Sequence, residues 1–244
     1  MRKILFITAT HGNERDGVEV MQQLEQEFPK EEYSYDWIIG NEKAYARNER
    51  YTEQDLNRSA PGDIESPIYE LRRAAEIIEI GKNFDIVIDL HGTKTDSGIV
   101  TIVPYPSREN IILAKSAGLQ RNVVWYSESS KTAGPLVQHM SVPAIEFECG
   151  PKGTSEAFTL TYDAVRRFIM ANYDGVNVDE NNEFYTVYGK LLGEHDPLLE
   201  DFVLATRQGD SFYPFLSGNE YPGITCYKMH KIESSQIPFM HEDL

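Results

Sequence analysis

Two histidines and one glutamate stand at spacings that suit a metal site. His11 and Glu14 lie three residues apart, directly after an apolar run at residues 4–9, and His91 stands at the end of a second apolar run. A catalytic zinc site commonly has three ligands drawn from histidine and carboxylate, plus one position for water. These three residues are therefore candidate zinc ligands, although an HxxE pair also occurs by chance in many sequences and a single histidine after a strand is usually structural.

The candidate ligands follow segments that predict β-strands. Residues 3–8 form a β-rich run, and apolar residues recur at helical spacing over residues 18–28. A strand at residues 35–39, a helix at residues 68–78 and a strand at residues 84–90 come next. This alternation predicts an α/β fold with a mixed, mostly parallel sheet flanked by helices. Ligands bind at the carboxyl ends of strands in such sheets, and both halves of the candidate site lie there.

Further segments extend the pattern toward the C-terminus. We expect strands at residues 98–103, 122–126 and 143–148, and helices at residues 109–117 and 155–173. Residues 174–182 are rich in Asp, Asn and Gly, and strand-like pieces broken by turn residues follow them. The sequence thus predicts a catalytic domain at residues 1–180 and a small β-rich C-terminal module at residues 181–244.

The composition limits the classes of partner. With 244 residues, of which 41% are hydrophobic, the chain can bury a sizeable core. Its 23 basic and 39 acidic residues leave a formal net charge of -16, which opposes binding to nucleic acids and to anionic membrane surfaces. The apolar run at residues 4–9 is only strand-sized, so we expect neither a signal peptide nor a membrane span. Cys149 and Cys226 are too few for a disulfide framework, which favours the cytoplasm.

Four blocks of sequence occur in an order and at spacings typical of one enzyme family. They are His11-Gly12-Asn13-Glu14, Asp55-Leu56-Asn57-Arg58, Asp89-Leu90-His91-Gly92-Thr93 and Glu148-Cys149-Gly150-Pro151. On these blocks the chain resembles the aspartoacylase and succinylglutamate desuccinylase family, which is similar to the M14 zinc carboxypeptidases. The resemblance covers residues 11–151 and is only loose in the C-terminal module. It implies a zinc-carboxypeptidase-like fold with one zinc ion per chain, held by His11, Glu14 and His91.

The resemblance also implies that Glu148 is the catalytic glutamate. Side chains alternate along the strand at residues 144–148, so Glu146 and Glu148 face one side while Ile145 and Phe147 face the other. Glu148 is nearer the carboxyl end, where the site is expected. For Glu146 we expect a supporting role behind the site or a place on the surface.

Three residues of the polar segment before residue 60 match substrate-binding positions of the family. Asn57 and Arg58 match the pair that holds the substrate carboxylate, for which a guanidinium fork is suited because it donates two parallel hydrogen bonds. Arg50 matches the arginine that polarises the scissile carbonyl. Without the resemblance, arginines on a polar loop would be expected to form solvated surface ion pairs.

Some positions depart from the family pattern or extend it. Aspartoacylases have a further arginine ten residues before the catalytic glutamate, where this chain has Gln138, so the resemblance does not extend to recognition of a second substrate carboxylate. Gly92 stands where many aspartoacylases have Asn. Tyr227 is a candidate for a tyrosine contributed by the C-terminal module, and packing is its alternative role. The remaining histidines are expected to be structural or exposed to solvent, namely His139, His195, His230 and His241.

The reaction implied by the resemblance is hydrolysis of an N-acyl amino acid to a carboxylate and a free amino acid. Zinc would lower the pKa of a bound water, Glu148 would act as general base, and Arg50 would polarise the amide carbonyl. A metallocarboxypeptidase acting on a peptide would use the same groups. A non-catalytic binding protein with the same fold is a third hypothesis.

Overall fold

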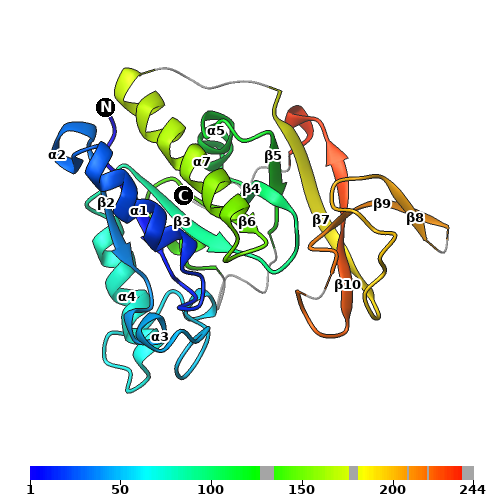
Figure 1. The fold of residues 1–244 in the computed structure, drawn as a ribbon, viewed down its shortest axis with the longest axis horizontal. Coiled ribbons are helices and arrows are strands. Elements are labelled where there is room, and N and C mark those ends of the chain that lie inside the picture. Colours follow the sequence, from blue (N-terminus) through cyan, green and yellow to red (C-terminus); the bar gives the residue numbers. More distant parts are fainter. Residues whose placement is uncertain (127–134, 176–180, 208, 219, 238–244) are drawn as a thin grey trace.

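One mixed β-sheet runs through the computed structural model, which describes residues 1–126, 135–175, 181–207, 209–218 and 220–237 (Figure 1). Ten strands within these ranges follow the order β2-β1-β3-β6-β4-β5-β7-β10-β9-β8. The strands are β1 (Ile4–Thr8), β2 (Tyr35–Ile39), β3 (Ile86–Gly92), β4 (Gly98–Val103), β5 (Arg121–Val124), β6 (Ala144–Gly150), β7 (Glu183–Leu192), β8 (Ala205–Arg207), β9 (Asp210–Phe215) and β10 (Ile224–Ile232). Strands β2, β1, β3 and β6 run parallel, whereas β4 is antiparallel to β6. The predicted mixed sheet flanked by helices is therefore confirmed.

The helices form where apolar residues recur at helical spacing and end where the backbone can turn. They are α1 (Asp16–Glu27), α2 (Lys30–Tyr33), α3 (Glu42–Arg47), α4 (Tyr69–Gly81), α5 (Arg108–Ser116) and α7 (Ser155–Asp174), with 3₁₀ turns η1 (Leu56–Arg58), η2 (Leu136–His139) and η3 (Ser234–Gln236). Helix α1 buries Val18, Met21 and Leu24 on one side. Helix α7 starts after Thr154, whose hydroxyl accepts a bond from the Ala157 amide, and stops at Gly175 in the left-handed conformation.

Side chains of the central strands alternate between the two faces of the sheet and pack into two separate cores. Ile88 of β3 and Phe147 of β6 join a core under α1, α5 and α7, and α1 and α7 lie side by side over this face (Figure 1). Val87 and Ala144, of the opposite parity, pack against α4, η1 and η2. Further along the same two strands, this second face carries polar residues in place of apolar ones, namely Asp89, His91, Glu146 and Glu148.

The end of β3 differs from the prediction. The sequence predicts a strand at residues 84–90 with His91 beyond it, but β3 continues to Gly92 because its pairing with β6 extends to Gly92 and Cys149. His91 therefore lies inside the sheet, opposite Glu148. The strand geometry, and not a loop, sets the direction of its side chain.

The C-terminal strands continue the sheet. Strand β7 pairs parallel with β5, β10 is antiparallel to both β7 and β9, and β8 pairs with β9 at the edge (Figure 1). The predicted domain boundary near residue 180 borders residues 176–180, which lie outside the described residues, so the division at this point stays a prediction. Among the helices that the structure describes, none is both long enough and apolar enough to cross a membrane.

Candidate metal and substrate site

A tight turn after β1 brings His11 and Glu14 together. The Glu14 amide donates to the His11 carbonyl, with N and O 2.9 Å apart. Gly12 is required between them, because a Cβ at this position would lie 2.2 Å from the backbone of Ala44. The His11 Nδ1 lies 3.0 Å from Glu14 Oε1, and the His91 Nδ1 lies 3.2 Å from Glu14 Oε2. All three side chains are buried, so the structure brings the predicted metal ligands to one point.

One aspartate lies beside the Nε2 atom of each imidazole. Asp55 Oδ1 lies 3.1 Å from His11 Nε2, and Asp89 Oδ2 lies 3.0 Å from His91 Nε2 in a close but imperfectly aligned contact. The Thr10 hydroxyl lies 2.8 Å from Asp89 Oδ1, which orients that carboxylate. Carboxylates in these positions leave both Nδ1 atoms directed at Glu14.

This donor set fits a zinc ion. The three ligand atoms of His11, Glu14 and His91 lie within 4.8 Å of one another. Two imidazole nitrogens and a carboxylate oxygen are ligands that zinc prefers, and an aspartate behind each imidazole is a common support. Asp89, His91 and Glu146 form a second cluster of the same kind. Because the shared His91 turns Nδ1 toward Glu14, the first cluster fits a metal ion better than the second.

The buried charged groups of the site shift one another's pKa values. Burial opposes ionisation of Glu14, but His11 and His91 hold the pKa of its carboxyl well below its ordinary value. Burial also lowers the pKa of His91, and the neighbouring Asp89 carboxylate outweighs this effect and raises it well above the ordinary value. The pKa of Asp55 is likewise held below its usual range by His11 and Arg50, against the effect of burial. The ligand set is thus a compensated group of buried charges.

The loop at residues 50–58 carries the predicted substrate-binding residues. Arg50 pairs with Asp55 at 3.2 Å and with Glu14 at 3.7 Å. The Asn57 side chain is buried, donating to Glu146 Oε1 at 3.2 Å and accepting from the Leu136 amide at 2.7 Å. Arg58 is exposed, donates to the Asn57 carbonyl, and forms no ion pair with an acidic group in the described part of the chain. Its guanidinium is therefore available for an anionic ligand.

A buried carboxylate on α4 anchors this loop. Glu70 is 0% exposed and accepts from the Thr52 amide at 2.8 Å and from the Thr52 hydroxyl at 2.6 Å. The amides of Glu53 and Gln54 and the Asn41 side chain also point at it, at 3.3, 3.4 and 3.2 Å. The loop that presents Arg50, Asn57 and Arg58 is thus fixed through one helix residue, which sequence reasoning did not single out.

The two glutamates of β6 face the same cavity but differ in their contacts. Glu146 is 5% exposed, is opposite Asp89 in the strand pairing, and accepts a hydrogen bond from Asn57. Glu148 is opposite His91, and no hydrogen bond joins its carboxylate to another described residue. Burial raises the pKa of Glu148 to about 8, with Glu14 and Glu146 adding to this effect and His91 opposing it. A raised pKa suits a group that must accept and return a proton near neutral pH.

The predicted site residues line one cavity of about 380 Å³. His11, Glu14, Arg50, Asn57, Arg58, His91 and Glu148 all line it. Its size is within the range of small-molecule sites. The roles of these residues stay predictions, but their convergence on one cavity is a geometric fact of the structure.

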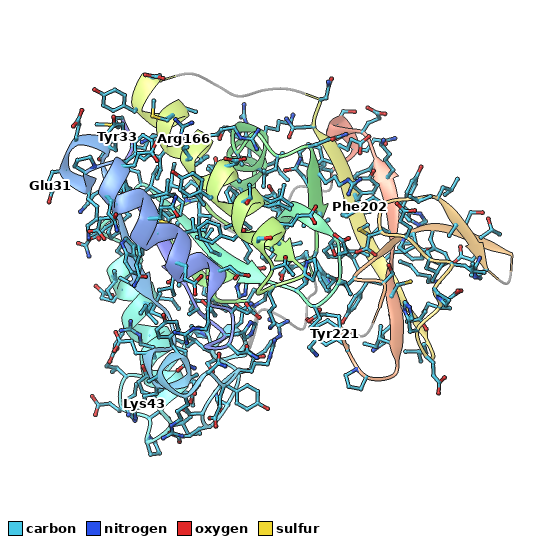
Figure 2. The ribbon with its side chains drawn as sticks, in the orientation of Figure 1. Glu31, Tyr33, Lys43, Arg166, Phe202 and Tyr221 are labelled. Carbon is cyan, nitrogen blue, oxygen red and sulfur yellow. The ribbon has the colours of Figure 1, made fainter. Side chains whose placement is uncertain are left out.

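The C-terminal strands close the opposite side of this cavity. Tyr227 of β10 lines it, as do Glu220 and Tyr221, and Tyr221 lies where the C-terminal strands approach the rest of the sheet (Figure 2). The Tyr221 and Tyr227 ring centroids are 5.9 Å apart. Sequence reasoning named Tyr227 but missed Tyr221, Glu220 and Trp125, for which no motif provided a signal. Asp55 and Asp89 stand inside the recognised blocks, so their position beside the ligands was a usable signal.

Lys152 contacts Glu14, one of the candidate metal ligands, and is not among the residues that line the cavity. Its Nζ lies 3.3 Å from Glu14 Oε1, while the Gly92 amide donates to Glu14 Oε2 at 3.1 Å. A Cβ on Gly92 would lie 2.9 Å from Lys152 Cβ, a distance that requires one of the two to move. The absence of a side chain at residue 92 therefore leaves room for Lys152. This contact accounts for glycine at the position where the sequence departs from many aspartoacylases.

The other described positions that the sequence analysis discussed do not line the cavity. Gln138 belongs to η2 and is not among the cavity-lining residues. His139 and His195 do not line the cavity either, and His230 stacks on Tyr188 with ring centroids 3.9 Å apart. His241 lies outside the described residues.

Comparison with known proteins shows the family and the fold of this chain. Residues 1–172 match the sequence model of the succinylglutamate desuccinylase/aspartoacylase catalytic domain. A probable aspartoacylase of Prochlorococcus marinus (strain MIT 9301) is 36% identical over 92% of this chain and 75% of its own length. Another, from Prochlorococcus marinus subsp. pastoris, is 38% identical over 44% of this chain, and the match spans only 39% of that relative. The crystal structure of murine aminoacylase 3 has the same fold, with a TM-score of 0.72, 21% identity, and coverage of 94% of this chain and 95% of that one.

Proposed function

We propose that this chain, which belongs to the succinylglutamate desuccinylase and aspartoacylase family, is a zinc-dependent hydrolase that cleaves the amide bond of an N-acyl amino acid. One observation carries the proposal. The buried ligand atoms of His11, Glu14 and His91 converge at a cavity that also contains Glu148 and the available guanidinium of Arg58. A metal site, a potential base and a carboxylate-binding group are the parts that such a hydrolysis needs.

His11, Glu14 and His91 would hold the zinc ion, and Asp55 and Asp89 would keep the two imidazoles in the orientation that exposes Nδ1. Bound zinc would supply a lowered pKa for water and polarisation of the substrate carbonyl. The free thiols Cys149 and Cys226 support a reducing, cytoplasmic location.

Glu148 is the proton carrier of the proposed reaction. Its carboxylate has no hydrogen bond from another described residue, so both oxygens remain available to a water molecule in the cavity. It takes the proton of the attacking water and returns it to the amide nitrogen as the carbon–nitrogen bond breaks. Glu146 is held by Asn57 and supports that side chain.

Arg58 and Arg50 bind different parts of the substrate in the proposed reaction. Arg58 donates its fork to the carboxylate of the amino acid, and Asn57, which lines the same cavity, has a second Nδ2 hydrogen to donate besides the one bonded to Glu146. Arg50 is fixed by Asp55 beside Glu14, where its N–H groups can stabilise the charge that develops on the carbonyl oxygen. Fixing both ends of the substrate orients the amide for attack.

The test combines metal analysis with a substrate screen. Purified protein should hold about one zinc ion per chain, and His11→Ala with His91→Ala together should abolish retention. Zinc-loaded protein should release free amino acid from acetyl, formyl or succinyl amino acids in preference to dipeptides. Glu148→Gln should lower turnover by about 10²- to 10⁴-fold with zinc retained, while the matched Glu146→Gln has a much smaller effect. Full zinc occupancy in the double histidine variant, or faster cleavage of dipeptides, would contradict the proposal.

A further inference from the structure

We propose that Lys152 controls how tightly the site holds its metal. Its ammonium lies against Glu14 and weakens zinc binding, so that zinc exchanges more readily than it would from the two histidines and the glutamate alone. The inference rests on the proposed function, because it takes Glu14 as a zinc ligand. It goes further by assigning the control of metal affinity to a described residue that does not line the cavity.

The ammonium of Lys152 is in contact with the Glu14 carboxylate. Lys152 Nζ lies 3.3 Å from Glu14 Oε1, and the two side chains are only 16% and 5% exposed. Water and salt screen such an enclosed pair less than they screen an ion pair on the surface. Arg50 approaches the same oxygen at 3.7 Å and also pairs with Asp55. Of these two cations, Lys152 is the one closer to Glu14.

The backbone directs the lysine toward the metal ligands. The Lys152 amide donates to the Thr93 carbonyl at 2.8 Å, two residues beyond His91. Gly92 has no side chain, and a Cβ there would lie 2.9 Å from Lys152 Cβ and 3.5 Å from Lys152 Cδ. The stem of the lysine therefore packs against the backbone of Gly92. The contact with Glu14 results from this fixed path and not from a freely moving surface side chain.

Other groups already orient the Glu14 carboxylate. The Glu14 amide donates to the His11 carbonyl within the turn, and the Gly92 amide donates to Glu14 Oε2 at 3.1 Å. Both contacts are made by the backbone, so they do not depend on the side chain of residue 152. What Lys152 adds is a positive charge beside a carboxylate that would also bind a zinc dication, and like charges repel. The net effect of the lysine is therefore weaker zinc binding.

The first experiment measures the zinc Kd of variants that separate the charge of Lys152 from its hydrogen bond. Lys152→Met removes the charge and keeps a long apolar stem, whereas Lys152→Gln removes the charge and keeps a donor. A unit charge and a dication a few ångströms apart repel strongly enough to change a binding constant by about tenfold, even with the screening of bulk water. Both variants should therefore lower the zinc Kd by about tenfold or more in competition with a chelator, and Lys152→Arg should keep the parent value.

The second experiment follows the release of zinc into excess chelator. We expect slower release from Lys152→Met and Lys152→Gln by about the same factor, because affinity differences between related complexes appear mainly in the dissociation rate. The matched control is Lys82→Met at the end of α4. Lys82 is an exposed lysine whose Nζ lies 2.6 Å from Glu79 Oε2, and its replacement changes the net charge of the protein by the same amount. The control should leave both the zinc Kd and the release rate unchanged.

Urea denaturation separates the proposed role from a purely structural one. If Lys152 only stabilised the fold, Lys152→Met would lower the urea midpoint and would raise the zinc Kd or leave it unchanged. We expect the zinc Kd to fall whatever the change in the midpoint. A raised or unchanged zinc Kd in either neutral variant would overturn the inference and leave the proposed function intact. No zinc binding by the parent protein would refute the proposed function itself, and the inference with it.

Discussion

Removing the carboxylate of Glu70 should loosen the substrate-binding loop without touching any residue that lines the cavity. Glu70 lies in α4 and accepts hydrogen bonds from Asn41, from Thr52 twice, and from the amides of Glu53 and Gln54. Those donors belong to the segment that leads from Arg50 to Arg58 or pack against it. Glu70→Ala leaves them without their acceptor.

The size of the effect follows from the two shortest contacts. The Thr52 amide and hydroxyl lie 2.8 and 2.6 Å from Glu70 Oε1. Hydrogen bonds to a charged group contribute about 1.5–3 kcal/mol each, so Glu70→Ala should lower the free energy of unfolding by about 3–6 kcal/mol. Glu70→Gln keeps one acceptor oxygen but loses the charge, which roughly halves the strength of such bonds, so we expect about 1.5–3 kcal/mol.

Urea denaturation at a fixed zinc concentration measures these losses, because bound zinc would itself shift the apparent stability. Since Glu70 acts by positioning the loop, Glu70→Gln should also raise KM more than it lowers kcat. The matched control is Glu76→Ala in the same helix, an exposed residue paired with Arg73, for which about 0–1 kcal/mol is expected. If Glu70→Ala unfolded at the same urea concentration as Glu76→Ala and kept the parent KM, the anchoring role would be wrong.

The remaining predictions concern pH, the metal and the substrate. Burial opposes ionisation of Glu70, but its hydrogen bonds hold the pKa of its carboxyl below the ordinary value of 4.5. The contribution of Glu70 to the free energy of unfolding is therefore present above pH 4.5 and is lost as the pH falls through the pKa of the folded state. Glu70→Gln should remove this part of the acid-induced loss of stability in urea titrations. Asp55→Asn should raise the zinc Kd by about 10- to 100-fold in a competition assay with a chelator, and an unchanged Kd would mean that Asp55 does not orient His11. Arg58→Lys should raise KM by about tenfold for free-carboxylate substrates but not for their carboxamides, with zinc retained. Gly92→Ala should destabilise the parent but cost about 1 kcal/mol less in a Lys152→Gly background, where the opposing Cβ is gone; additive losses would refute the contact.

The sequence could predict those parts of the site that share a strand end or a short turn. His11 and Glu14 are three residues apart, and Asp55 stands two residues before Asn57, so local spacing already places them together. The mixed sheet was predictable for the same reason, because each strand and helix shows its own period. The extent of β3 was not, since the pairing that carries it to Gly92 depends on β6, more than fifty residues away in the chain.

Trp125, which lines the cavity beside Tyr227, escaped prediction for a similar physical reason. Trp125 follows β5 and Tyr227 lies in β10, and only the pairing of β5 with β7 and of β7 with β10 brings their rings together. In the sequence, Trp125 is indistinguishable from a core aromatic, and Tyr227 was a candidate only through the family resemblance. The sequence also gives no signal for the anchoring role of Glu70, because an acidic residue in the first turn of a helix is usually explained by the helix dipole.

The apolar core and the reactive face are two consequences of one strand register. In β6, Ile145 and Phe147 pack under α5 and α7, and the alternation of side chains then forces Glu146 and Glu148 onto the cavity side. A slip of one residue would bury both carboxylates among apolar side chains and expose Phe147, which costs far more than any single contact of the site. Burial of Phe147, 1% exposed, therefore keeps Glu148 on the cavity face of β6, where it is opposite His91 in the strand pairing. The alternation of the strand thus directs the Glu148 carboxylate to the cavity although no other described residue is hydrogen-bonded to it.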